Sequence, residues 1–138
     1  MVIIPNNLHL HVSLEEYVRI CIKESQQMIE MLHEKATSAQ VEHMLENYSS
    51  MIKIVVDTRQ KILAGGGEIH SDCKKVLLDH GSDQDDLWGA NWYPGDQRIE
   101  FEALINIRPR LGNRGILIQS EEIRQKVESI TRMLLGDV

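Results

Sequence analysis

Residues 52–81 read IKIVVDTRQKILAGGGEIHSDCKKVLLDHG, and the spacing of the apolar residues in this stretch decides the fold class. Ile52, Ile54 and Val56 alternate with Lys53 and Asp57, and a second apolar run at residues 62–64 follows a short polar turn. This arrangement predicts two antiparallel strands. After the glycine run the period becomes that of a helix, so we expect a helix over residues 71–80 that ends at Gly81 in the left-handed conformation.

Helical patterns lie on both sides of this centre. Ser13 begins a capping box, in which a serine hydroxyl and a glutamate three residues later satisfy free amides, and it predicts a helix over residues 13–35. Thr37 begins a second such signature, which predicts a helix over residues 38–48 and therefore an N-terminal helical hairpin. A last helix is expected to begin after Ser120.

The longest predicted strand spans residues 98–108. Apolar residues alternate with polar ones along it until Pro109, which removes a ladder donor and stops the pairing. We expect this strand to be central, with Phe101, Ile105 and Ile107 buried.

Length and composition fit one folded domain. The chain has 138 residues, of which 42% are hydrophobic, and a chain of this size can bury one core without disulfides or metals. We therefore expect a single α+β domain over residues 1–138, in which helices cover a mostly antiparallel sheet of three to five strands.

Sequence features favour a cytoplasmic protein. Residues 1–5 are too short for the core of a signal peptide, and no run approaches the roughly 20 apolar residues of a membrane span. Cys21 and Cys73 lie far apart and lack the spacing of a metal or redox motif, as is usual in a reducing compartment. We expect no membrane partner.

The charge distribution argues against nucleic acid as a partner. The formal net charge is −6, whereas nucleic-acid binding needs a broad basic face. Residues 103–120 nevertheless contain three arginines and no acid. Either Arg108, Arg110 and Arg114 pair with the neighbouring acidic block of residues 68–102, or they form a local anion site.

Four blocks stand out by their order and spacing: GGEIHSD at residues 66–72, GSDQDDLWGAN at residues 81–91, LINIRP at residues 104–109, and Asn113-Arg114. Over residues 51–136 the chain resembles a small bacterial family that is catalogued only as a domain of unknown function. Ser71, Lys74 and Ala103 depart from the pattern of that family. The resemblance implies no activity.

His70 is the centre of the candidate site. It lies near Glu68 and Asp72, and an imidazole beside a carboxylate can act as a general base or as a metal ligand. The glycines before the helix can let backbone amides reach an anion, although they can equally serve a simple turn. The candidate ligand-binding residues are Gly67, Glu68, His70, Asp72, Arg108 and Arg114.

Two functions remain open. The first is a non-enzymatic binding or regulatory module that holds a small anionic ligand. The second is a small enzyme that uses His70 with Glu68 or Asp72 for acid–base chemistry and Arg108 or Arg114 as an anion clamp. Because no nucleophile or cofactor motif is recognisable, the cofactor is unknown and we favour the module.

We also expect a homo-oligomer. The predicted N-terminal helices carry more apolar residues than one narrow stripe can bury. These residues are Met28, Ile29, Met31, Leu32, Met44 and Leu45.

Other polar patterns have simpler explanations. His9 and His11 would share one face of a strand as two metal ligands, but no third ligand can be named. The acidic run of Asp79, Asp83, Asp85 and Asp86 lacks the ligand spacing of a calcium loop. Glu100 and Glu102 would share one strand face, as an acid–base pair or as an exposed surface. The aromatic cluster of Trp88, Trp92, Tyr93 and Phe101 fits a core, an interface or a ligand wall.

Overall fold

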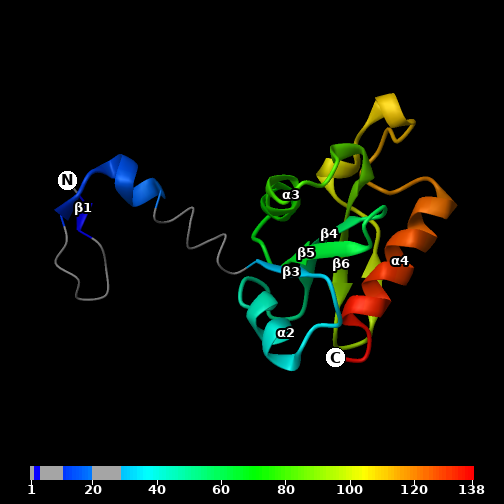
Figure 1. Ribbon diagram of the computed structural model, residues 1–138, viewed down its shortest axis with the longest axis horizontal. Helices are drawn as coiled ribbons and strands as arrows, with labels where there is room; N and C mark the ends of the chain where they lie inside the picture. Colours follow the sequence, from blue (N-terminus) through cyan, green and yellow to red (C-terminus); the bar gives the residue numbers. More distant parts are fainter. Residues whose placement is uncertain (1, 4–10, 20–28) are drawn as a thin grey trace.

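The fold is built on an antiparallel sheet (Figure 1). The computed structural model describes residues 2–3, 11–19 and 29–138. Within the last of these ranges five strands lie in the order β3–β5–β4–β6–β7, and each neighbouring pair is antiparallel. The strands are Glu30–Leu32 (β3), Ile52–Asp57 (β4), Ile62–Gly65 (β5), Leu87–Tyr93 (β6) and Arg98–Glu100 (β7). The predicted α+β class is confirmed.

Helices cover both faces of this sheet. Helix α3 (His70–Asp79) and helix α4 (Glu121–Leu135) lie on opposite sides of it, and α2 (Ser38–Met44) lies near the C-terminal end of α4 (Figure 1). Three short 3₁₀ turns join the other elements: Gln84–Asp86 (η1), Leu104–Asn106 (η2) and Pro109–Leu111 (η3). Among the described residues, none of the helices has the length and apolar character that a membrane crossing requires.

The core has two parts because side chains alternate across the sheet. Ile54 and Val56 of β4 lie in the larger part, with Trp88 and residues of α2 and α4. Val55 points to the other face and packs in a smaller cluster with Cys73 of α3. The periodicity of residues 52–56 was therefore a correct guide to β4, which is the central strand.

One backbone contact joins the segment before α2 to the end of α4. The amide of Ala36, just before α2, donates to the carbonyl oxygen of Leu134 near the end of α4, at 2.8 Å. Both residues belong to the larger core cluster.

The N-terminal hairpin prediction needs correction. Residues 14–19 are helical, and the Ser13 hydroxyl accepts from the amide of Glu16 at 3.2 Å, as the capping signature predicts. Residues 30–32 form β3 instead of the end of a long helix, because their backbone pairs with β5. Residues 20–28, which include Cys21 and Met28, lie outside the described residues. Strand β1 (Val2–Ile3) pairs with β2 (His11–Val12).

The apolar residues that suggested self-association are used within the domain. Leu32 and Met44 are buried in the core, and Ile29, Met31 and Leu45 are partly buried against it. The described part of the predicted apolar face is therefore not free for a partner. The homo-oligomer itself stays a prediction.

The predicted strand over residues 98–108 is wrong in length and position. Only β7 is a strand, and it lies at the edge of the sheet. The chain then turns through η2, where the Asn106 side chain bonds to β6 and interrupts an extended course. Phe101 and Ile105 are half-buried and Ile107 is 43% exposed, so the predicted burial of these three residues is also wrong.

Strand β6 was not predicted as a strand. Trp88 and Trp92 are both buried in the larger core cluster, so the core interpretation is correct for these two aromatics. Tyr93 and Phe101 are half-buried.

Candidate functional site

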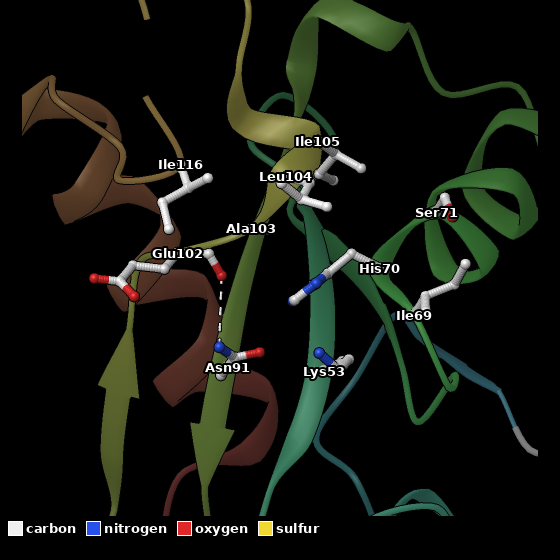
Figure 2. Close-up of a pocket in the computed structure, with 10 residues that line it drawn as sticks. All are labelled: Lys53, Ile69, His70, Ser71, Asn91, Glu102, Ala103, Leu104, Ile105 and Ile116. Carbon is white, nitrogen blue, oxygen red and sulfur yellow. Dashed lines mark hydrogen bonds between the residues drawn. The ribbon is translucent and has the colours of Figure 1, made fainter. Parts of the chain in front are cut away.

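A cavity of about 540 Å³ opens on the α3 side of the sheet (Figure 2). It lies between the start of α3, the strands β4 and β6, and the segment that follows β7. Its polar side chains are Lys53, His70, Ser71, Asn91 and Glu102, and its apolar side chains are Ile69, Ala103, Leu104, Ile105 and Ile116.

A side-chain clamp holds the wall formed by residues 102–106. The Asn106 amide accepts from the backbone amide of Gly89 at 2.8 Å and donates to the carbonyl oxygen of Gly89 at 2.9 Å. It also donates to the carbonyl oxygen of Ile116 at 3.1 Å. The wall packs closely on β6 because Gly89 has no side chain, and a Cβ there would lie 2.5 Å from the Cβ of Ala103.

A second asparagine fixes the next part of the loop. The buried Asn113 amide donates to three carbonyl oxygens, those of Asn106, Gly115 and Leu117, and its oxygen accepts from the amide of Gln119. The segment that carries Ile116 is therefore held in place although it is neither helix nor strand.

His70 lies at the start of α3 with its ring against β6. The residue is 8% exposed, and its Nε2 lies 2.9 Å from the carbonyl oxygen of Ala90. Because a carbonyl can only accept, Nε2 carries the proton and Nδ1 has a free lone pair in the neutral ring. Burial lowers the pKa of His70, the Lys53 ammonium lowers it further, and the contacts with Ala90 and Asn91 oppose this shift. The ring is therefore neutral at pH 7.

Asn91 places an acceptor beside the His70 ring, where it favours the protonated imidazole, but no donor makes a hydrogen bond of normal geometry to it. Its Nδ2 donates at 3.5 Å to the carbonyl oxygen of Glu102, which orients Oδ1 away from that carbonyl (Figure 2). Oδ1 is buried and has no hydrogen-bond partner within the described part of the chain. Buried polar atoms are nearly always paired, so this atom is the most unusual feature of the cavity.

Lys53 brings a positive charge to the same place. It lies directly opposite Asn91 in the pairing of β4 with β6, so both side chains project from the α3 face of the sheet. Its ammonium lies 5.4 Å from the centre of the Tyr48 ring. Such a cation–π contact is weak at a partly exposed site and can be exchanged for an anion.

The three residues around His70 in the sequence do not form a catalytic pair with it. Gly67 is buried, and it packs so closely on α3 that a Cβ there would lie 3.0 Å from the Cys73 sulfur. Glu68 is exposed, and its carbonyl oxygen accepts from the Tyr48 hydroxyl. Asp72 lies in the first turn of α3. The hydrogen-bond partner of the His70 ring is Ala90, not either carboxylate.

The structure does not bring Arg108 into the cavity with His70. The buried Arg108 guanidinium donates to the carbonyl oxygens of Gln84, Leu87 and Ile105, and it lies 4.8 Å from the centre of the Trp88 ring. Burial lowers the pKa of Arg108, but arginine remains charged. Each of its three nitrogens donates to a backbone carbonyl, so it serves the loop and not an anion.

The other two arginines differ from each other. Arg110 pairs with Asp85, as one of the two sequence interpretations predicts. Arg114 is exposed and does not line the cavity.

Several other polar residues singled out in the sequence either bond to partners outside the cavity or lie outside the described residues. Asp83 caps η1 and Asp86 pairs with Arg59. Glu100 accepts from the Tyr93 hydroxyl and pairs with Arg98, so it does not form a carboxylate pair with Glu102. His9 lies outside the described residues. In the described ranges, no three His, Cys, Asp or Glu side chains gather as a metal site requires.

Sequence reasoning missed Lys53 and Asn91. Lys53 carried a weak signal, since it is the one charged residue within the apolar run of residues 52–56. Asn91 ends the GSDQDDLWGAN block, but its position opposite Lys53 depends on strand register, which the sequence does not show.

Comparison with known families matches residues 30–134 to a family described as "Protein of unknown function (DUF5674)". The matched range begins with β3 and ends within α4, so it coincides with the sheet and its covering helices. Searches of curated proteins and of solved structures gave no match.

Proposed function

The chain belongs to the DUF5674 family, whose description gives no activity, and we propose from its cavity that it is a binding module for a small anionic ligand. The unpaired, buried Oδ1 of Asn91 carries this proposal. Leaving such an atom unsatisfied costs about 1–3 kcal/mol, a cost that a ligand donor would remove.

The shape and lining of the cavity support the same function. Small-molecule sites commonly have volumes of roughly 300–1,000 Å³ and combine apolar walls with a few convergent polar groups. The cavity of about 540 Å³ has aliphatic walls at Leu104, Ile105 and Ile116, and its polar groups gather at Lys53 and Asn91. Lys53 provides the charge that attracts an anion.

Binding explains the arrangement of His70 better than acid–base catalysis does. An acid–base pair would place Glu68 or Asp72 against the ring, whereas a backbone carbonyl occupies Nε2. A neutral, firmly oriented imidazole is well suited to line a binding site. The anion clamp of the enzyme alternative also loses Arg108, which is committed to carbonyl oxygens.

Native mass spectrometry of freshly purified protein tests the proposal. Wild type should retain a small molecule, and Asn91→Leu should release it. Gln125→Leu is the matched control, because Gln125 lines a separate groove of about 460 Å³ beside α4 and undergoes the same change in polarity. Retention by Asn91→Leu, or protein that carries nothing and is not stabilised by any member of a library of small organic anions, would refute the proposal.

Self-association belongs to the same proposal. The loop after β7 exposes aliphatic side chains at Ile107, Leu111 and Leu117, which a second copy could cover. Sedimentation velocity at micromolar concentration should show an assembly larger than the monomer, and Leu117→Glu should reduce its mass. A monomer in wild type would contradict this part.

A further inference from the structure

We infer that the polar end of the ligand is a carboxylate whose neighbouring carbon bears an O–H or N–H group, as in a 2-hydroxy acid or a 2-amino acid. This inference rests on the proposed function, and it names the chemical class of the ligand. It follows from the positions of Lys53 and Asn91 and from what each can accept or donate.

The two residues require opposite hydrogen-bonding roles from the ligand. The Lys53 ammonium only donates, so it pairs with an anionic acceptor. The free Oδ1 of Asn91 only accepts, so it requires a donor. A simple carboxylate satisfies Lys53 and leaves Asn91 unpaired, whereas a simple alcohol or amine leaves Lys53 without an anion.

Their register requires both groups at the same end of the ligand. Lys53 and Asn91 are directly opposed on adjacent antiparallel strands. Side chains in that relationship start from Cβ atoms roughly 4.5–5.5 Å apart. A donor on the carbon next to the carboxylate therefore meets Asn91 while the carboxylate meets Lys53.

The other side chains that line the cavity restrict the charge of the ligand and the polarity of the part beyond its polar end. Lys53 is the one cationic side chain that lines the cavity in the described part of the chain, and His70 is neutral, so the cavity offers one cationic partner to one carboxylate. The Glu102 carboxylate is directed away from the space between His70 and Asn91 (Figure 2). Leu104, which is 78% exposed, Ile105 and Ile116 offer an aliphatic surface for the remaining part of the molecule.

Calorimetric titration with four probes that share one aliphatic body tests the inference. These are racemic 2-hydroxy-4-methylpentanoate, L-leucine, 4-methylpentanoate without the donor, and 4-methylpentane-1,2-diol without the carboxylate. The hydroxy acid or the amino acid should bind about five- to tenfold more tightly than 4-methylpentanoate, the value of one hydrogen bond.

Two variants test whether Asn91 recognises the donor of the ligand and Lys53 its carboxylate. In Asn91→Leu the hydroxy acid and 4-methylpentanoate should bind equally, because the acceptor that distinguishes them is gone. In Lys53→Met the acids should weaken and the diol should not. Lys61→Met is the matched control at the other groove and should change neither affinity.

The outcomes separate this inference from the function on which it rests. If wild type binds 4-methylpentanoate as tightly as the two acids that carry a donor, the inference of a donor next to the carboxylate is wrong. The proposal that the cavity binds a small anionic ligand is not affected by that result. A retained molecule that Asn91→Leu releases, without binding of any acid, would likewise overturn the assignment alone. Protein that retains nothing and binds none of the probes would overturn both.

Discussion

Asn106 pairs with Gly89 through both ends of its side-chain amide, so a side chain takes the place of a neighbouring strand beside the middle of β6. The partner strand β7 reaches only residues 91–93 of β6. The amide thus satisfies the backbone of Gly89 where no strand does, and it fixes the wall of the cavity by the same contacts.

Replacing Asn106 with leucine should strongly destabilise the protein. Its side chain is fully buried, and the change leaves the amide and the carbonyl of Gly89 without partners. Each unsatisfied group costs about 1–3 kcal/mol, so we expect a loss of about 2–6 kcal/mol in the free energy of unfolding by urea titration. Asn47→Leu is the control, because it removes one bond, to Gly66, from a half-buried position. A loss no greater than that of the control would contradict the role of Asn106.

A methyl group at Gly89 should disturb the cavity without unfolding the domain. Because the added Cβ would lie 2.5 Å from the Cβ of Ala103, the loop must move away from β6. Overpacking of this kind costs about 1–3 kcal/mol. Gly89→Ala should therefore lower the melting temperature and weaken binding of the cavity ligand. Gly95→Ala, where no atom lies within 4 Å, is the control and should change neither quantity.

His70 should make stability depend on pH in the acid range. The pKa of His70 is lowered by burial, so the unfolded chain takes up a proton first as pH falls through about 6.5. The free energy of unfolding should therefore decrease from about pH 6.5 down to the folded-state pKa and be insensitive to this group above pH 6.5.

His70→Gln isolates this contribution, since its amide can still donate to Ala90 but does not titrate. The variant should lose less stability than wild type between neutral and acid pH in urea titrations. Identical slopes for wild type and His70→Gln would show that His70 is not responsible.

Cys73 should be unreactive in the folded protein. Burial raises the pKa of the Cys73 thiol to about 12. Compared with an exposed thiol of pKa about 8.5, the thiolate fraction at pH 8 is lower by roughly a thousandfold. In a Cys21→Ser background, iodoacetamide should label the native protein slowly and the urea-unfolded protein rapidly. Similar rates in the two states would contradict the burial of this thiol.

Local patterns predicted those elements whose hydrogen bonds are local. The strands β4 and β5 and the helix α3 follow from alternation, a short turn and a helical period, and the structure has them within one or two residues of the predicted bounds. The start of α4 follows from Ser120, whose hydroxyl accepts from the amide of Ile123.

Elements that depend on distant contacts were not predicted. Apolar alternation continues past β7, yet the chain turns because Asn106 bonds to Gly89, a residue 17 positions earlier. Strand β6 has buried residues on both faces, so its sequence does not alternate between polar and apolar. The cavity was recognised at His70 but not at Lys53 and Asn91, because strand register brings those two together.

The hydrogen bond between Ala36 and Leu134 has a consequence for how the chain can be reconnected. Because the segment that follows β3 meets the end of α4 there, a flexible linker could run from the C-terminus to the start of β3, and new ends could be opened in the exposed turn at Gly95, between β6 and β7. Chains tolerate such circular permutation where their ends are close and the new break lies in an exposed turn. The order in which the five strands of the sheet leave the ribosome would then change while their order in the sheet stayed the same, so the sheet does not require β3 to be synthesised before its other four strands.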